Sequence, residues 1–176
     1  MKKIVLLLLR SCNRLFYPSF NCPDDLIVAT FKNIFIQKIL GFNRKAFWPV
    51  HFTSKVIAPQ NIKIGSRAPG LSISCYLDGR NGIQLGKNVW IGPRVTLVSK
   101  NHSVTNFNEY IDDSPITIGN NCWLAANVTI LPGVQLANHI IVAAGSVVTK
   151  SFDEENILIG GTPARKIKSI MSYENR

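Results

Sequence analysis

Aliphatic residues recur along this chain at a strict spacing of six. The positions are Leu85, Ile91 and Leu97, and then Ile118, Leu124, Ile130, Leu136, Val142 and Val148. The next residue in each unit is often glycine or alanine, and the fifth is usually small or β-branched. Neither an α-helix, with about 3.6 residues per turn, nor the two-residue alternation of a strand produces this period. The repeat therefore predicts a parallel β-helix, in which each six-residue unit forms one flat side of a coil.

The spacing breaks once, between Leu97 and Ile118, whose offset is not a multiple of six. Residues 103–114 are polar and rich in turn-forming residues, so we expect a loop to leave the coil there. An imperfect coil is expected upstream, through Leu71, Ile73 and Leu77. Downstream of Val148, the sequence G-G-T-P at residues 160–163 predicts a turn before a short basic tail.

The N-terminal part of the chain differs from the repeats in pattern and in charge. Asp24 and Asp25 are suitable helix-start residues before Leu26 to Leu40, and Gly41 is a suitable end. We expect this helix to cover the open end of the coil, where strand edges would otherwise recruit other chains. The predicted organisation is an N-terminal helical, basic capping segment (residues 1–55), a β-helix with its loop (56–152) and a C-terminal turn and tail (153–176).

Charge is concentrated in the N-terminal segment. Residues 1–60 hold nine Lys or Arg against two Asp, giving +7, whereas residues 61–176 hold eleven against eight acids, giving +3. A basic, apolar segment of this kind suits contact with an anionic membrane surface, and a solvated basic face is the alternative. The sequence has no basic stripe interleaved with aromatic residues and no helix-turn-helix spacing, so we expect no nucleic-acid partner.

The same segment bears on location. No apolar run approaches the roughly 18 residues of a membrane span, and Ile4 to Leu9 is shorter than a usual signal-peptide core and lacks a clear cleavage site. We therefore expect a cytoplasmic protein, with peripheral contact at the inner membrane surface as an option. The four cysteines form no C-x-x-C pair, which favours reduced, structural thiols; they are Cys12, Cys22, Cys75 and Cys122.

Three stretches resemble one protein family. They are the I-G-x-x-V-x repeats, the sequence P-I-T-I-G-N-N-C-W-L-A-A-N-V-T-I-L-P-G-V from Pro115 to Val134, and A-A-G-S-V-V-T-K followed by G-G-T-P-A-R. Over about residues 60–170 the chain resembles the hexapeptide-repeat O-acetyltransferases, in particular the maltose, galactoside and surface-polysaccharide branch. The resemblance implies a left-handed parallel β-helix, acetyl-CoA as co-substrate without a metal, and a homotrimer with active sites between subunits.

The resemblance assigns His102 as the catalytic residue. This histidine ends the L-V-S-K-N-H unit where the loop begins, at the position of the family's catalytic histidine. Transfer of an acetyl group from a thioester to an alcohol requires a base for the hydroxyl proton, and imidazole suits that task near neutral pH. We expect direct transfer, without an acyl-enzyme. A solvated loop histidine is the alternative interpretation.

Seven residues match family positions on the acetyl-CoA side. By this resemblance, Trp123 lies near the pantetheine arm of CoA. Ala125 and Ala126 line the channel for the thioester, where a backbone N–H could stabilise the oxyanion. Basic groups contact the phosphates of CoA. The remaining matches are Ala144, Thr149, Lys150 and Arg165. The tryptophan is equally suited to covering one edge of a coil, and the basic residues to a solvated surface.

The acceptor is less well defined. Maltose and galactoside acetyltransferases carry an asparagine that contacts the acceptor, and this chain lacks it in L-S-I-S-C-Y-L-D-G. The basic N-terminal segment instead resembles small acetyltransferases of surface-polysaccharide assembly, such as capsule or O-antigen, with lipid-linked or nucleotide-linked acceptors. Polar residues that could bind acceptor hydroxyls are Ser72, Ser74, Asp78, Asn106, Asn108, Tyr110 and Asp112.

One other function fails on the sequence, and three remain open. A β-helical carbonic anhydrase needs three zinc-binding histidines, and Ala144 stands where the third would follow His102 and His139. An N-acetyltransferase acting on an amino sugar would share the fold, the base and the CoA site. An O-acetyltransferase acting on a xenobiotic alcohol and a non-catalytic scaffold are the other two possibilities.

Overall fold

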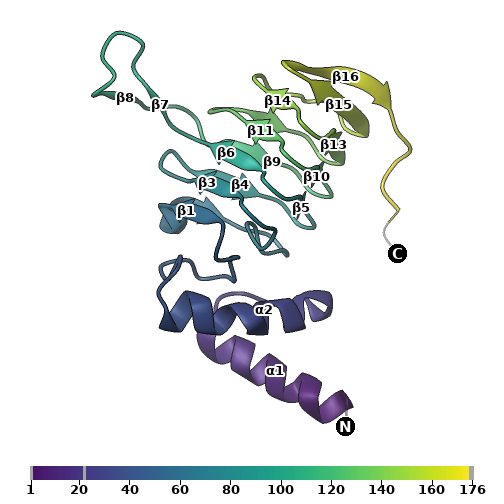
Figure 1. Cartoon of the computed structure of the whole chain (residues 1–176). Helices are drawn as coiled ribbons and strands as arrows, with labels where there is room; N and C mark the ends of the chain where they lie inside the picture. Colours follow the sequence, from purple (N-terminus) through teal and green to yellow (C-terminus); the bar gives the residue numbers. More distant parts are fainter. Residues whose placement is uncertain (1, 22, 175–176) are drawn as a thin grey trace.

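The chain folds into a coil of short parallel strands that stands on a layer of helices (Figure 1). The computed structural model describes residues 2–21 and 23–174. Three sheets form the sides of the coil, and within the stacked coils neighbouring strands run parallel. The predicted parallel β-helix is therefore confirmed.

Each side of the coil is one sheet. The first sheet consists of β1 (Lys55–Ile57), β3 (Tyr76–Asp78), β6 (Thr96–Val98), β11 (Thr129–Ile130) and β14 (Val147–Val148). The second consists of β2 (Ile62–Lys63), β4 (Ile83–Leu85), β9 (Ile116–Ile118) and β12 (Gln135–Leu136). The third consists of β5 (Trp90–Ile91), β10 (Trp123–Leu124), β13 (Ile140–Val142), β15 (Ile157–Gly161) and β16 (Ala164–Ser169). Only the β15–β16 pair in these three sheets is antiparallel among the described residues.

The strand register explains the six-residue spacing. Ile118 pairs with Leu136, and Ile130 pairs with Val148, so one full coil consists of three six-residue units. Across the break in the repeat, Leu97 still pairs with Ile130, although the loop lies between them. The loop therefore lengthens a single coil and leaves the register of the strands on either side unchanged.

The aliphatic positions of the repeat point inward and form the core. From Ile118 to Val148, all six are at most 3% exposed. The fifth positions of the units are buried as well, including Cys122 and Ser146. Burial of these side chains in a continuous column is the main stabilising contribution that such a coil can obtain, because its strands are too short to be stable separately.

The glycine after the aliphatic position is required by the spacing of the coils. A Cβ atom added to Gly119 would lie 2.7 Å from the backbone carbonyl carbon of Ala137 in the next coil. The same atom added to Gly92 would lie 2.9 Å from the carbonyl carbon of Ala125. Successive coils therefore approach too closely at these two glycines for a side chain.

The N-terminal layer contains α1 (Lys2–Phe16), η1 (Asp24–Leu26), α2 (Ile27–Ile34) and η2 (Phe35–Ile39). The expected helix from Leu26 to Leu40 is present, but it changes type: it starts as a 3₁₀ turn and ends as a π-helix. At the π segment the Gln37 side chain is buried and accepts hydrogen bonds from Tyr17 Oη at 2.9 Å and Val50 N at 2.8 Å. None of the helices in the described part of the chain is long and apolar enough to cross a membrane.

The coil end that faces this layer is filled by the segment after η2. Trp48 is fully buried, belongs to the same hydrophobic cluster as Leu77 and donates from Nε1 to the Pro69 carbonyl at 2.8 Å. The coil expected through Leu71, Ile73 and Leu77 is less regular than a repeat would make it. Ile73 is half exposed, and residues 64–75 form no strand. The first coil is closed by this loop rather than by repeats.

Candidate active site

The loop that interrupts the repeats forms a hairpin projecting from the coil (Figure 1). It follows β6 and contains β7 (Asn101–His102) and β8 (Tyr110–Ile111), which pair antiparallel. His102 lies directly opposite Tyr110 in this pairing, and their ring centroids are 4.4 Å apart. The predicted catalytic histidine is therefore exposed at the base of the hairpin.

A backbone carbonyl orients the imidazole of His102. Its Nδ1 atom lies 2.6 Å from the carbonyl oxygen of Phe107, on the turn of the same hairpin. A carbonyl can only accept a hydrogen bond, so Nδ1 must carry the proton. The neutral ring then presents a lone pair at Nε2, which is the arrangement that a general base needs.

An ion pair between a buried carboxylate and a partly exposed guanidinium contacts Tyr110. The Arg80 guanidinium carbon lies 4.6 Å from the Tyr110 ring centroid, and its Nη2 atom is 2.7 Å from Oδ2 of Asp78. Asp78 is fully buried, and it also accepts hydrogen bonds from the Arg80 backbone N and from Nε. The hydrogen bond to Asp78 raises the pKa of Arg80, so the guanidinium stays charged. Three side chains thus connect the coil to His102: Asp78, Arg80 and Tyr110.

The structure separates the residues predicted for the acceptor. Tyr110 contacts His102, whereas the Asp78 carboxylate is occupied by Arg80. Asn106 lies at the tip of the hairpin, where its Nδ2 atom donates to Glu109 at 2.8 Å. Ser72 and Ser74 belong to the loop before β3, and Ser72 Oγ donates to the Ile91 carbonyl on the third sheet. Within one chain these two serines therefore lie away from the hairpin.

The outer face of the third sheet carries an apolar groove of about 310 Å³. Trp123 lies between Trp90 and Ile141 in the strand register, and both tryptophan side chains are half exposed. Tyr173 from the C-terminal segment reaches this groove, where its hydroxyl accepts a hydrogen bond from Asn88 Nδ2 at 2.8 Å. The groove can hold a flexible, mostly apolar chain.

Ala125, Ala126 and Ala144 lie beside this groove, at the corner between the third and first sheets. The Ala125 N–H donates to the Val142 carbonyl at 3.0 Å and is therefore used within the coil. The carbonyl of Ala126 accepts from Gly145 N at 2.9 Å, which places the Ala144 segment directly above it. The Ala126 amide is the other candidate for the oxyanion donor expected at this corner.

The predicted basic contacts occupy two different edges. Arg165 lies exposed on β16, in the same sheet as Trp123. Thr149 and Lys150 directly follow β14, and the His102 hairpin follows β6, in the first sheet. We call the corner after the first sheet, with the His102 hairpin, the histidine edge, and the third sheet with Trp123 the tryptophan edge. In one chain these two edges are separated by one six-residue side, which spans at most about 20 Å.

The two cysteines described within the coil, Cys75 and Cys122, are buried and poorly suited to act as nucleophiles. Cys122 lines the groove, but burial raises the pKa of its thiol to about 11, and its Sγ lies 3.3 Å from the Ala137 carbonyl oxygen. Burial also raises the pKa of the Cys75 thiol. Cys12 is a free thiol, and Cys22 lies outside the described residues. Within residues 2–21 and 23–174, His, Cys, Asp and Glu form no group of three that could hold a metal ion.

Three site residues were missed by the sequence reasoning. Arg80 stands two positions after Asp78, a spacing that a strand followed by a turn brings together. Trp90 pairs with Trp123 in the next coil, so the register could have found it once the length of the loop had been allowed for. Tyr173 follows the hairpin of β15 and β16, and no repeat predicts where that segment returns.

Comparison with known proteins places these features in context. A family model described as bacterial transferase hexapeptide (six repeats) matches residues 115–150. Over 91 residues the chain is 40% identical to the galactoside O-acetyltransferase of Escherichia coli strain K12, covering 50% of this chain and 44% of the relative. Over 121 residues it is 31% identical to a protein of the same strain named as a colanic acid biosynthesis acetyltransferase, covering 68% and 65%.

A solved structure is similar in fold as well as in sequence. It is a hexapeptide-repeat acetyltransferase from Vibrio cholerae O1 biovar eltor, complexed with acetyl-coenzyme A. The TM-score is 0.53 at 29% identity, and the match covers 68% of this chain and 69% of that chain. The chain spans about half the length of the curated relatives it matches.

Proposed function

The chain belongs to the hexapeptide-repeat acetyltransferases, and we propose that it transfers an acetyl group from acetyl-CoA to a hydroxyl group of a saccharide. The observation that carries the proposal is the orientation of His102, whose Nδ1 proton is held by the Phe107 carbonyl. This arrangement leaves Nε2 to act as the base. The named activities of the relatives and the complex of a neighbour with acetyl-CoA support the choice of donor.

In the proposed reaction His102 handles a single proton. Its Nε2 atom removes the proton from the acceptor hydroxyl while the hydroxyl oxygen attacks the thioester carbonyl carbon. The negative charge that develops on the carbonyl oxygen is stabilised by the Ala126 N–H. The tetrahedral intermediate then releases the CoA sulfur, which takes the proton from His102, and the acetyl ester leaves. No acyl-enzyme is required, in keeping with the raised pKa of Cys122.

Each active site is proposed to form between two chains of a homotrimer. The hairpin with His102 and the groove with Trp123 lie on different edges of one coil, so one chain brings together only half of the site. A neighbouring copy related by threefold symmetry can place its tryptophan edge against the histidine edge of the first chain. Lys150 and Arg165, which lie on these two edges, would then approach the CoA phosphates from different chains.

The proposed acceptor is a saccharide unit of a surface polysaccharide, carried on a lipid or a nucleotide. One relative is named for colanic acid biosynthesis and another for lipopolysaccharide biosynthesis. The absent asparagine argues against a free disaccharide of the maltose type.

The test is thiol release from acetyl-CoA by purified protein, with a panel of free, nucleotide-linked and lipid-linked saccharides and mass spectrometry of the products. We expect His102→Ala to lower turnover by about 100-fold or more, the scale of a lost general base. His51→Ala is the matched control, because His51 lies in the segment before β1 and contacts Thr53 rather than the hairpin.

The outcomes separate the remaining functions. An ester that depends on both His102 and the acceptor supports the proposal, and an amide product identifies an N-acetyltransferase instead. Equal losses in His102→Ala and His51→Ala would remove His102 from the mechanism. A protein that does not bind acetyl-CoA, measured by calorimetry, is a scaffold.

A further inference from the structure

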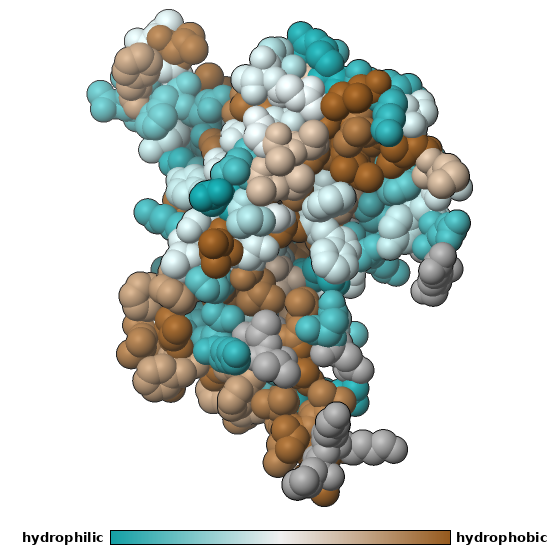
Figure 2. All heavy atoms as spheres, turned by 45° about the vertical axis from the view of Figure 1, so that its right-hand side comes forward, coloured by the Kyte–Doolittle hydropathy of each residue, from teal (hydrophilic) through white to brown (hydrophobic). Residues whose placement is uncertain are grey.

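The helical layer exposes two rows of large apolar side chains. On α1, Ile4, Leu8 and Leu15 lie along one outward face, and each is between 65 and 74% exposed. On α2 and η2, Phe31, Phe35 and Ile39 follow at every fourth position and are also exposed. Figure 2 shows brown and tan surface over the helical layer, at the end of the molecule opposite the hairpin.

These rows are not needed to hold the layer together, because the helices pack through their other faces. The side chain of Asn13 is buried and donates to the Leu9 and Ile27 carbonyls, tying α1 to α2. The outward rows are therefore surplus to the fold. A contiguous apolar surface of this kind on a folded protein marks a site of interaction with another apolar body.

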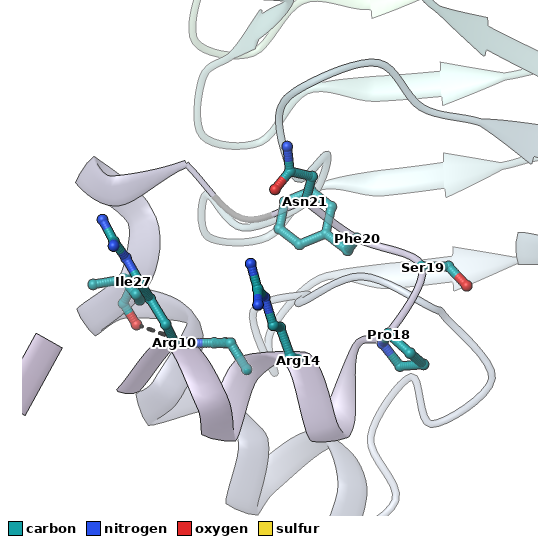
Figure 3. Close-up of a pocket in the computed structure, with 8 residues that line it drawn as sticks. Arg10, Arg14, Pro18, Ser19, Phe20, Asn21 and Ile27 are labelled. Carbon is teal, nitrogen blue, oxygen red and sulfur yellow. Dashed lines mark hydrogen bonds between the residues drawn. The ribbon is translucent and has the colours of Figure 1, made fainter. Parts of the chain in front are cut away.

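Basic side chains border the apolar rows. Arg10 and Arg14 lie one turn apart on the flank of α1 between the outward row and the buried Asn13, and they line a hollow of about 540 Å³ beside Phe20 and Ile27 (Figure 3). Across residues 1–60 the chain carries nine Lys or Arg against two Asp, and Asp25 is paired with Arg67 at 3.0 Å. The segment that carries the apolar rows therefore has a net charge of +7.

We propose that this helical layer docks on the surface of an anionic lipid bilayer. Apolar rows with a basic border match the boundary between acyl chains and phosphate headgroups, as in other amphipathic helices that lie in the membrane plane. Arg10 and Arg14 bind lipid phosphates at the rim, while Leu8, Leu15 and Phe35 enter the acyl region. A second copy of the chain is a poorer occupant, because two segments of charge +7 would face each other.

The test is flotation of the purified full-length protein with phosphatidylcholine vesicles, with and without phosphatidylglycerol. We expect binding to the anionic vesicles alone, weakening as salt rises, because the basic groups are exposed. Leu8→Glu with Leu15→Glu should reduce the partition coefficient by about 100-fold or more, and Arg10→Ala with Arg14→Ala by about tenfold.

Matched controls lie elsewhere on the surface. Ile167→Glu with Met171→Glu changes two equally exposed apolar residues of the C-terminal segment, and Lys63→Ala with Lys87→Ala removes two exposed charges from the coil. Both controls should bind as the wild type does.

Two results would overturn the inference. The first is that folded wild-type protein floats with neither type of vesicle at low salt. The second is a fall in oligomeric mass, measured by light scattering, in the Leu8→Glu and Leu15→Glu protein, which would make the face an interface between copies. The vesicle assay needs no acetyl transfer, so its outcome is independent of the proposed activity.

Discussion

The ion pair between Asp78 and Arg80 permits a quantitative test of how the coil supports the hairpin. Asp78 is fully buried, whereas a third of the Arg80 side chain reaches solvent. Removing the arginine leaves a buried carboxylate without its partner, and changes of that kind cost about 3–5 kcal/mol. We expect Arg80→Ala to fall near the lower end of that range, because water can partly replace the exposed guanidinium.

The double variant makes the argument specific. In Asp78→Asn with Arg80→Ala no charge remains buried, so the loss should be smaller than that of Arg80→Ala alone, at about 1–2 kcal/mol. The coupling energy between the two changes should then be about 2 kcal/mol or more. Urea denaturation followed by circular dichroism measures all four free energies of unfolding, provided that the slopes agree.

Additive losses in the two single variants would refute this reasoning. They would show that Arg80 contributes to stability through packing on Tyr110 rather than by neutralising Asp78. In that case Tyr110→Ala should reproduce the effect of Arg80→Ala.

Three further predictions concern the site and the coil. Lys150→Ala with Arg165→Ala should raise KM for acetyl-CoA and leave kcat nearly unchanged, because these groups would contact bound phosphates and not the reacting carbonyl; steady-state kinetics with varied acetyl-CoA checks this. Gly119→Ala should lower the free energy of unfolding by about 1–3 kcal/mol, since its Cβ would meet the Ala137 carbonyl of the next coil at 2.7 Å, and urea denaturation measures the loss. Burial raises the pKa of Cys122 in the folded state to about 11 from an ordinary value of 9.0. The unfolded thiol therefore ionises first, and the contribution of Cys122 to the free energy of unfolding is complete below pH 9 and is lost as the pH rises toward 11. The free energy of unfolding, measured between pH 8 and 11, should decline less steeply with pH in Cys122→Ala.

The coil could be predicted because its period is a local property of the sequence. Once each side of the coil is one six-residue unit, the pairing of Ile118 with Leu136 follows from three units per turn. The offset between Leu97 and Ile118 locates the loop for the same reason. His102 was predicted from its place in the family pattern, and the structure adds the Phe107 carbonyl that lies 2.6 Å from its Nδ1 atom.

The remaining features depend on contacts that no repeat encodes. Tyr173 follows β16, whereas its partner Asn88 precedes β5, and these two strands lie at opposite edges of the third sheet. The π turn at η2 accompanies Gln37, whose buried amide joins Tyr17 to Val50, residues on separate segments. Sequence periodicity relates a residue only to others in the same repeated pattern. It therefore cannot predict contacts between separate segments.

The division of the proposed site between two edges of the coil leads to a test by subunit mixing. His102→Ala removes the base and leaves the groove intact, whereas Ala126→Phe fills the corner beside Trp123 and leaves the base intact. Each variant alone should be inactive. In a trimer with sites between chains, one of the three sites in every mixed assembly combines an intact histidine with an intact groove.

Mixed trimers can be isolated by coexpressing the two variants with different affinity tags and purifying on both. Their activity should be about a third of the wild-type value, because cyclic symmetry gives every mixed ring one intact junction. If instead His102 and the Ala126 corner of the same chain formed each site, no mixed assembly would contain an intact one, and the product would stay at background. Because the histidine edge and the tryptophan edge lie apart in one chain, we expect the mixed trimers to be active.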